Sequence, residues 1–423
     1  MAPKDDPTGL APRRAAWRLL TGVTEEGRTL SDTRLDHLSA PDRARSMRLA
    51  LTACRELGKA DRVLAPFLRK RPKGPLRNLL RLGVVELAGG APAHGVVNAM
   101  VSLAGEDKRT ASGRGLINAV LRKAADTVEG WDKLPVPTLP RWLRRPLVEA
   151  WGQRAVQRME HAHLIGAPLD LTARSEPDAV AKATGGTVLP TGSVRLTDPG
   201  RITDLAGYAS GEWWVQDAAA ALPVRMLGPR RGETIVDLCA APGGKTLQLA
   251  AAGAEVTAVD VSEDRLATVA ENLARTGLGA GLVACDARRF SGGPFDAVLL
   301  DAPCSATGTI RRHPDLPIAR DGAEIAGLIA LQSDLIDHAV TLLRPGGRLV
   351  FCTCSLLPDE GECQVEEALE RHPGLAVDRG WTSASWVDPD WISSEGGLRL
   401  RPDYWPERGG MDGFYAALLT MPA

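Results

Sequence analysis

The spacing of hydrophobic residues changes about halfway along the chain. Over residues 13–128 apolar side chains recur every three or four positions, for example between Leu76 and Leu87, which is the period of amphipathic helices. From Thr234 onward, short apolar runs alternate with helical stretches, which is the order typical of a parallel sheet with crossover helices. The pattern therefore predicts a helical N-terminal bundle and a C-terminal α/β domain.

The C-terminal half contains five apolar runs of strand length. Strands are expected at Thr234–Cys239, Glu255–Asp260, Gly281–Cys285, Phe295–Leu300 and Arg348–Thr353, with edge strands at Leu398–Pro402 and Gly413–Thr420. Helices are expected at Thr246–Ala252, Glu263–Thr276 and Ala323–Leu343. The last of the edge strands would be antiparallel if the sheet ends in a reversed pair.

The boundaries between domains follow proline-rich and weakly patterned stretches. At 423 residues the chain is long enough for two or three domains. We expect a flexible tail over 1–12, a helical domain over 13–133, a linker with a small α+β module over 134–205, and a catalytic domain over 206–423. The linker begins with the alternating prolines of Leu134–Pro140.

Composition excludes several classes of protein. No apolar run approaches the 18 residues of a membrane span, and Met1–Gly9 is polar. We therefore expect a cytoplasmic protein without a membrane partner, whose seven cysteines are free thiols. The cysteines form no CxxC pairs, so no metal site is expected.

Charge is unevenly distributed along the chain. Residues 1–150 carry 27 Lys and Arg against 16 Asp and Glu, a net charge of +11, whereas the rest of the chain carries −12. A basic first part suggests nucleic-acid binding, although an arginine-rich genome would produce the same bias. The sharpest basic cluster is Arg69–Lys73, which is either a solvated loop or a contact to RNA phosphates.

A glycine turn follows the first strand of the α/β domain. Its residues, Cys239-Ala240-Ala241-Pro242-Gly243-Gly244-Lys245, match neither a Walker A loop nor a dinucleotide loop. The next two strands end in Asp260 and Asp286, which are suited to ribose hydroxyls and to an adenine amino group. Any one of these acids could be a simple strand-end cap, but together they favour S-adenosylmethionine. Arg265 and Asp301 are further candidates for contacting this cofactor.

Two cysteines follow two strands that we expect to be neighbours. Phe295–Leu300 is followed by Asp301 and Cys304, and Arg348–Thr353 is followed by Cys354. Neighbouring strands lie about 4.8 Å apart, so both thiols would face one pocket, although a lone cysteine is more often simply buried. A thiolate that adds to carbon 6 of a pyrimidine activates carbon 5 for methylation. Asp301 could protonate N3, and Lys245 could favour the thiolate.

Three motifs carry a resemblance to a known family. Asp237–Thr246, Asp301–Gly308 and Thr353–Ser355 resemble, in this order, the RsmB/NOL1/NOP2/Sun family of RNA (cytosine-5)-methyltransferases. The segments from Arg81 to Arg122 resemble the NusB-like RNA-binding domain of the bacterial RsmB (Sun) branch. The resemblance implies a multi-domain protein with an all-α NusB-like bundle, a small α+β middle module and a Rossmann-like methyltransferase domain.

The resemblance also implies roles for both cysteines. In this family the Thr-Cys cysteine, here Cys354, is the nucleophile, and the Pro-Cys cysteine, here Cys304, assists product release. The residues alone would have favoured Cys304 as the nucleophile. Cys352 is interpreted as a packing residue, and Cys54, Cys239, Cys285 and Cys363 are not expected to act as nucleophiles. The family pattern usually has Asn after Glu360, where this chain has Gly361, and the segment Arg311–Asp315 matches residues expected to face RNA.

The function implied by the resemblance is methylation of cytosine C5 in RNA, with 16S ribosomal RNA as the expected substrate. We expect S-adenosylmethionine as cofactor, RNA and not DNA as partner, and a monomer. Two alternatives stay open at this point. One is the same chemistry on transfer RNA, and the other is a non-catalytic RNA-binding or ribosome assembly factor.

Overall fold

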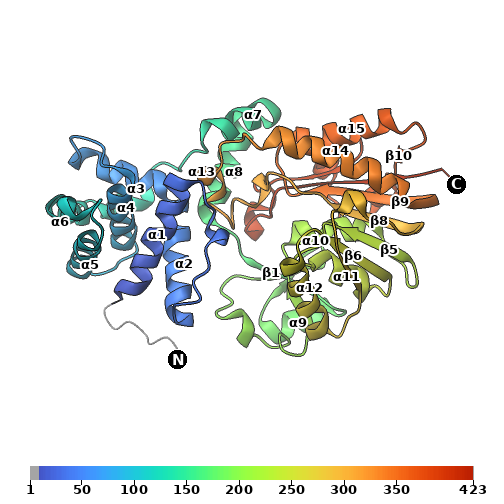
Figure 1. Ribbon diagram of the computed structural model, residues 1–423, viewed down its shortest axis with the longest axis horizontal. Helices are drawn as coiled ribbons and strands as arrows, with labels where there is room; N and C mark the ends of the chain where they lie inside the picture. Colours follow the sequence, from blue (N-terminus) through green and yellow to red (C-terminus); the bar gives the residue numbers. More distant parts are fainter. Residues whose placement is uncertain (1–8, 423) are drawn as a thin grey trace. The chain divides into compact units, whose positions relative to one another are not determined.

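The computed structural model describes residues 9–422, and these form two compact units. The first unit contains the chain up to Ile165 together with the later segment Ile310–Asp321. The second contains Gly166–Thr309 and the chain from Gly322 onward. Figure 1 shows the course of the chain through both. Residues 1–8 of the expected tail lie outside the described residues, and the first helix begins at Leu10, within that tail.

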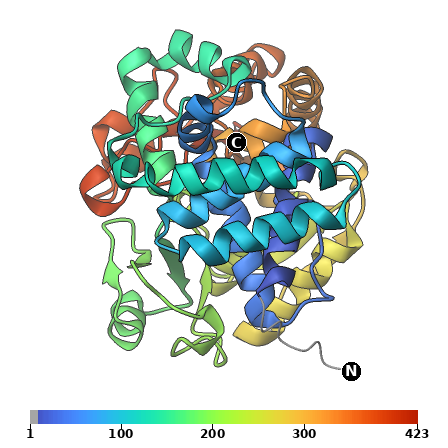
Figure 2. The same cartoon turned by 90° about the vertical axis from the view of Figure 1, so that its left-hand side faces the viewer.

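The first unit is built from helices whose apolar faces form one core. Its main helices are α1 (Leu10–Glu26), α2 (Ala40–Arg55), α3 (Leu57–Leu64), α4 (Gly74–Ala88), α5 (Ala93–Glu106) and α6 (Arg114–Ala125). Helix α4 is central, because Leu79–Leu87 is buried over its whole length. Helices α5 and α6 pack side by side (Figure 2). The predicted helical bundle is confirmed.

Two more helices extend this unit into the region expected to be a separate module. They are α7 (Arg141–Trp151) and α8 (Gln153–Ile165), and they are separated by Gly152, whose φ of +79° breaks the helix. The short helix α13 (Leu316–Ala319) joins them from far along the chain, and Trp142 Nε1 donates a hydrogen bond to the Pro317 carbonyl at 3.2 Å. The region 134–205 is therefore divided between the two units.

The second unit is dominated by one eight-stranded sheet. Its strands are β5 (Thr234–Leu238), β6 (Glu255–Asp260), β7 (Gly281–Ala284), β8 (Phe295–Asp301), β9 (Leu343–Thr353), β10 (Ala376–Val377), β11 (Leu398–Leu400) and β12 (Phe414–Thr420). The order is β10-β12-β9-β8-β5-β6-β7, with β11 paired to β12. Strands β5 to β9 are parallel, and β12 runs antiparallel to β9. The predicted α/β fold with a reversed final strand is confirmed.

Alternating residues of each strand feed two cores on opposite faces of the sheet. Ile235 packs on the face covered by α10 (Ala218–Leu227) and α11 (Gly244–Ala251), whereas Val236 packs on the face covered by α14 (Ile325–Thr341) and α15 (Glu362–Arg371). Figure 1 shows these helix pairs on the two sides of the sheet. Helix α12 (Glu263–Thr276) packs beside α11. Because both faces are covered, the strands read as continuous apolar runs.

A second, four-stranded antiparallel sheet precedes the large one within this unit. It consists of β1 (Leu169–Ala173), β2 (Thr187–Val188), β3 (Val194–Leu196) and β4 (Trp213–Val215), with α9 (Pro177–Thr184) packed against it. The buried ion pair between Arg195 and Asp170, at 2.7 Å, anchors it, because Arg195 also donates to the carbonyl of Gly410 at 2.7 Å. None of the helices in the described part of the chain is long and apolar enough to cross a membrane.

Candidate active site

The two expected cysteines meet at adjacent strand ends. Strands β8 and β9 are parallel neighbours, with Asp301 opposite Cys352. The chain leaves β8 through a proline turn to Cys304 and leaves β9 directly into Cys354. The two Sγ atoms are 3.5 Å apart, within hydrogen-bonding distance. The juxtaposition predicted from the order of the strands is therefore present.

Backbone hydrogen bonds connect the two cysteine loops. The Ala302 amide donates to the Cys352 carbonyl at 2.9 Å, and the Gly308 amide donates to the Cys354 carbonyl at 2.9 Å. The Gly413 amide then donates to the Gly308 carbonyl at 2.8 Å. A Cβ atom on Gly308 would lie 2.0 Å from the Gly413 oxygen. Glycine is needed at position 308 because the backbones approach too closely for any side chain.

Three cysteines near the strand ends have raised pKa values. The pKa of the Cys304 thiol is raised well above its usual value by its hydrogen bond to Cys354 and by burial, so Cys304 remains protonated and neutral. Burial, followed by the charge of Asp301, likewise raises the pKa of Cys352. Burial raises the pKa of Cys239 to about 12. Cys239 and Cys352 therefore stay neutral at neutral pH. Cys352 is fully buried, whereas Cys239, Cys304 and Cys354 are partly buried.

Lys245 pairs with Asp301. Its Nζ lies 2.7 Å from Asp301 Oδ2 and 4.9 Å from the ring centre of Phe414. Burial is the largest single effect and lowers the pKa of Lys245, but the charge of Asp301 and the hydrogen bond to it, together with Cys352 and Asp237, outweigh burial, and the net direction is upward. Lys245 is therefore a permanent cation, and its closest charged partner is this carboxylate. This contact differs from the expected one, in which Lys245 would face a thiol.

The glycine turn after β5 is held by the acid at the end of β6. Asp260 Oδ2 accepts the Ala241 amide at 3.0 Å, and Asp260 Oδ1 accepts the Ser262 amide at 3.0 Å. Arg265 pairs with Asp260 at 3.4 Å and also donates to the Ala241 carbonyl. Gly243 has a φ of +99°, a conformation that favours glycine. The turn, Asp260 and Arg265 thus form one connected group.

Asp286 lies beyond the next strand of the same edge. It follows β7, whose Ala284 is opposite Asp260. Its hydrogen bond from the side chain of Arg288, at 2.7 Å, lowers its pKa to about 2, so the carboxylate is ionised at neutral pH. Three carboxylates therefore lie at the ends of parallel strands of the same sheet: Asp260 and Asp301 are the last residues of β6 and β8, and Asp286 comes two residues after β7.

These groups fit the cofactor expected from the sequence. Carboxylates and backbone groups beside a glycine turn can accept hydrogen bonds from ribose hydroxyls and from an adenine amino group. The turn lacks the first glycine of a phosphate-binding loop, where Cys239 stands with a φ of +61°. In addition, Asp237 Oδ1 is a buried acceptor with no hydrogen-bond partner among the described residues. The set of acceptors suits a nucleoside without a triphosphate.

Two buried carboxylates were missed in the sequence. Asp237 is the fourth residue of β5, and its Oδ2 accepts the Thr246 hydroxyl at 2.6 Å. Burial raises the pKa of Asp237 to about 7. Glu360 is completely buried beside both cysteine loops. Asp237 stands within an apolar strand, and this position could have identified it as a buried acid. Glu360 lies in the polar stretch Asp359-Glu360-Gly361-Glu362, where the sequence does not distinguish a buried acid from a surface acid.

The segment Arg311–Asp315 does not present the RNA-facing surface expected from the resemblance. Arg311 and Asp315 are both buried in the first unit. The Arg311 carbonyl accepts from Arg55 Nη2 at 2.8 Å, and Asp315 Oδ2 accepts the Leu30 amide at 2.8 Å. The expectation was wrong for these two residues because packing within that unit removes them from solvent. His313 between them is exposed.

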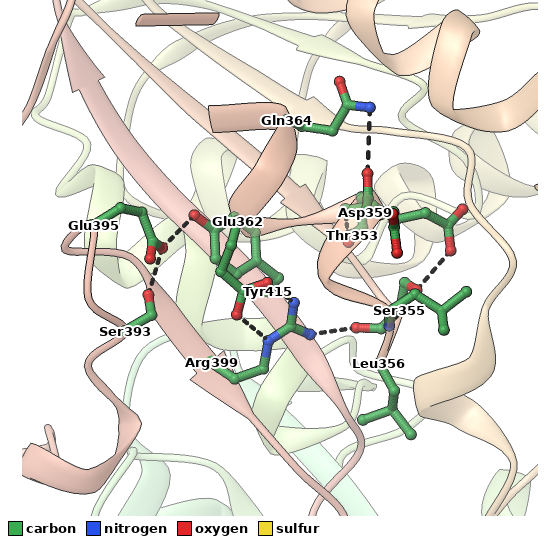
Figure 3. Close-up of polar contacts among 12 residues, drawn as sticks. Thr353, Ser355, Leu356, Asp359, Glu362, Gln364, Ser393, Glu395, Arg399 and Tyr415 are labelled. Carbon is green, nitrogen blue, oxygen red and sulfur yellow. Dashed lines mark hydrogen bonds and ion pairs between the residues drawn. The ribbon is translucent and has the colours of Figure 1, made fainter. Parts of the chain in front are cut away.

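Gly361 departs from the family pattern, and the space that it leaves is used. Helix α15 still begins immediately after it, at Glu362. A Cβ atom on Gly361 would lie 2.4 Å from Arg399 Nη2. Arg399 binds both oxygens of Glu362 and donates to the Ser355 carbonyl at 2.5 Å, as Figure 3 shows. Gly361 therefore makes room for an arginine that reaches the Cys354 loop.

The sheet order, the glycine turn and the acids at the strand ends together define a Rossmann-like methyltransferase. Comparison with known proteins gives the family. Residues 224–420 match the family described as 16S rRNA methyltransferase RsmB/F, and residues 10–126 match the NusB family. The chain belongs to the RsmB/F family of RNA methyltransferases with an N-terminal NusB domain, as the sequence motifs had suggested, and its cofactor is S-adenosylmethionine.

Whole-length relatives support this assignment. The chain is 35% identical to the ribosomal RNA small subunit methyltransferase B of Pseudomonas syringae pv. tomato over 441 residues, which covers 96% of each chain. It is also 35% identical to the protein of the same name from Vibrio cholerae serotype O1, over 96% of this chain and 97% of that one. Among solved structures, a methyltransferase homolog from Pyrococcus horikoshii is 27% identical with a TM-score of 0.56, covering 67% of this chain and 95% of that one.

Proposed function

We propose that this protein methylates carbon 5 of a cytosine in 16S ribosomal RNA, with Cys354 as the nucleophile and Cys304 as the residue that assists release. The observation that supports this proposal most directly is the 3.5 Å separation of the two sulfur atoms at adjacent strand ends. Two thiols at this distance can both reach one cytosine ring. One sulfur can form the covalent adduct, and the other can assist cleavage of that bond.

Cys354 begins the reaction by forming a bond from its sulfur to carbon 6 of the cytosine. The electrons of the 5,6 double bond then make carbon 5 a nucleophile, so that one difficult step becomes two easier ones. S-adenosylmethionine supplies an electrophilic methyl group when it is bound. A base, which can be a water molecule, accepts the proton from carbon 5; the electrons of that C–H bond restore the double bond as the bond between sulfur and carbon 6 breaks, and Cys354 leaves as a thiolate.

Cys304 is suited to the release step. Its raised pKa keeps it a neutral thiol, and a neutral thiol beside Cys354 can donate a hydrogen bond to the sulfur that leaves. A deprotonated Cys304 would instead place two negative charges 3.5 Å apart, which is costly in a buried site. We therefore assign Cys304 to the protonated form, in which it can donate to the Cys354 sulfur.

The ion pair of Lys245 and Asp301 is proposed to contact the target base. Asp301 is the last residue of β8, three residues before Cys304. Lys245 stays protonated because its pKa is raised, and its Nζ lies 2.7 Å from Asp301 Oδ2. The pair can therefore hold a proton at the N3 edge of the cytosine. This contact would favour electron movement away from carbon 6 and would therefore assist attack by Cys354.

The cofactor is proposed to lie along the edge formed by the ends of β5, β6, β7 and β8. The residues assigned to it are Cys239, Ala240, Ala241, Pro242, Gly243, Gly244, Lys245, Asp260, Arg265, Asp286 and Asp301. Asp260 already orients the turn through the Ala241 amide and keeps acceptor capacity for ribose hydroxyls. The ionised Asp286 is assigned to the adenine amino group.

The remaining parts of the chain are proposed to hold the substrate. The names of the whole-length relatives refer to small-subunit ribosomal RNA, and the net charge of +11 over residues 1–150 suits phosphate contacts. We assign RNA binding to the NusB domain over 13–133 and to the region 134–205, and catalysis to 206–423. We further propose a cytoplasmic monomer that acts on RNA rather than DNA and turns the target base out of its stack.

Replacement of each thiol separates the proposed roles. Cys354→Ala removes the nucleophile, so we expect no methylation with RNA binding retained. Cys304→Ala leaves attack possible but hinders release, so we expect a covalent RNA–protein adduct that migrates slowly on a denaturing gel. Cys363→Ala, which removes a partly buried thiol from α15, is the matched control and should methylate normally. Bisulfite sequencing of ribosomal and transfer RNA from cells with and without the gene provides the substrate readout.

Several outcomes would contradict the proposal. Full activity of Cys354→Ala would remove the nucleophile assignment. Normal turnover of Cys304→Ala without an adduct would remove the release role. If cells without the gene lose methylation of a cytosine only in transfer RNA, the substrate is transfer RNA and not 16S ribosomal RNA. If methylation of both RNAs is unchanged in those cells, the protein is better explained as a non-catalytic assembly factor.

A further inference from the structure

A buried carboxylate connects the two cysteine loops. Glu360 is completely inaccessible to solvent and follows β9 by seven residues. Its Oε1 accepts the amide of Ser305 at 2.9 Å, and its Oε2 accepts the hydroxyls of Ser305 and, at 2.6 Å, Ser355. Ser305 and Ser355 are the residues that immediately follow Cys304 and Cys354. One side chain therefore holds both loops at the position next to each thiol.

In a second contact, the Cys304 loop supplies the acceptor and the Cys354 loop supplies the backbone donor. Thr307, from the Cys304 loop, accepts the amide of Leu356 at 2.9 Å. Its hydroxyl also lies 3.2 Å from the Ser355 hydroxyl, which in turn accepts the Leu357 amide at 3.0 Å. Each loop thus supplies a side-chain acceptor for a backbone amide of the other. The relative position of the two thiols is fixed by this network rather than by the sheet alone.

The Cys354 loop has anchors that do not involve Glu360. The Cys354 carbonyl accepts from the Gly308 amide, and the Ser355 carbonyl accepts from Arg399 at 2.5 Å. Arg399 is itself held by Glu362 and lies over the Tyr415 ring at 4.9 Å (Figure 3). This loop would keep much of its position if the Glu360 carboxylate were removed.

The start of the Cys304 loop depends more strongly on Glu360. The Ala302 amide before this start and the Gly308 amide after it bind carbonyls of the other strand end. Between these two bonds, apart from the Ser305 contacts, the side chain of Gln332 donates to the Pro303 carbonyl at 2.9 Å. The same Gln332 amide group donates to Glu360 Oε1 at 3.1 Å, so the carboxylate also orients this second anchor. Loss of Glu360 would leave buried donors without acceptors, mostly on the Cys304 side. The two thiols therefore differ in how much they rely on this residue.

We propose that Glu360 is a positioning residue that keeps Cys304 beside Cys354 for the release of the methylated RNA. This inference rests on the proposed function, because it assigns Glu360 to the step in which the bond between Cys354 sulfur and carbon 6 breaks. Glu360 does not contact the RNA in this proposal. It acts through Ser305, whose backbone and side chain it binds directly.

The test compares Glu360→Ala with Glu360→Gln. In Glu360→Ala we expect the covalent adduct to accumulate on a denaturing gel and turnover to fall by about tenfold to a hundredfold, because the buried hydrogen bonds of one carboxylate are lost. In Glu360→Gln, one oxygen can still accept from Ser305 and the hydroxyls can rotate to accept from the amide group, so most turnover should return. Thermal unfolding of each variant is measured alongside.

Glu362→Ala is the matched control, because it removes a neighbouring acid that supports only the Cys354 side through Arg399. We expect this variant to form less adduct, not more. If Glu360→Ala loses adduct formation in parallel with its thermal stability, or turns over normally without adduct, the positioning role is wrong. A failure of the proposed function gives a different result from a failure of the positioning role. If the proposed function is wrong, Cys354→Ala remains active, independently of the result for the Glu360 variants.

Discussion

At the scale of single residues, burial sets the charge of several acids and thiols around the site. Seven cysteines are present, but the pKa of Cys239 and of Cys352 is raised chiefly by burial, and both remain neutral. The sequence predicted neither as the nucleophile. Asp237 could not be assigned in the same way, because its raised pKa depends on burial and on the charges around it in the folded protein.

The pH dependence of stability should reveal Asp237. Its pKa is 3.8 in an ordinary setting and about 7 when folded, so between these values the folded state holds one proton more than the unfolded state. Raising the pH through this range therefore lowers the stability of the wild type. The asparagine in the variant Asp237→Asn does not titrate. The free energy of unfolding of this variant minus that of the wild type should therefore rise by about 2–3 kcal/mol from pH 5 to pH 8. Urea titrations at both pH values provide the measurement, and a pH-independent difference would contradict the assignment.

At the scale of elements, the site is made by two strand ends and one close backbone contact. The sequence predicted the parallel strands and their acidic ends, because apolar runs and turn residues are local signals. It did not predict that Gly308 would bind the Cys354 carbonyl and the Gly413 amide. That contact joins β8, β9 and the start of β12, whose pairing cannot be read from any one of them.

Gly308→Ala tests the importance of this contact. The added Cβ atom would lie 2.0 Å from the Gly413 oxygen, so the loops must separate, at a cost of about 1–3 kcal/mol in the free energy of unfolding. We expect methylation to fall by at least about tenfold because the sulfur pair is displaced. Gly327→Ala is the control, since its Cβ in α14 would meet nothing within 4 Å, and it should gain about 0.5–1 kcal/mol. Equal behaviour of the two variants in chemical denaturation and methylation assays would contradict this account.

At the scale of the whole molecule, one segment of the catalytic half belongs structurally to the first unit. Residues 310–321 begin directly after Thr309, six residues beyond Cys304, yet they complete the helical unit. Asp315 holds the Leu30 amide there, and Arg55 holds the Arg311 carbonyl. The helical unit therefore stabilises the continuation of a catalytic loop.

Separate expression of residues 166–423 should expose this segment. We expect trypsin to cut after Arg311 and Arg312 about tenfold faster in this fragment than in the full chain, because the helices that bury the segment are missing. Cleavage after Arg288 and Arg289, which are exposed within the second unit, should be equally fast in both proteins and serves as the control. Mass spectrometry of the peptides gives the rates. Equal protection of the segment in both proteins would show that it folds without the first unit.

The sequence by itself determined the helical bundle, the alternating strands and helices, the reversed last strand and the candidate residues of the site. Each of these depends on periodicity or on motifs that lie within a few residues of one another. Only the tertiary structure decided that the two sulfurs lie 3.5 Å apart, that Lys245 faces Asp301, that Glu360 binds both loops and that Arg311 is buried. These facts depend on contacts between residues distant in sequence and on the burial that such contacts create, and neither is encoded in any local pattern.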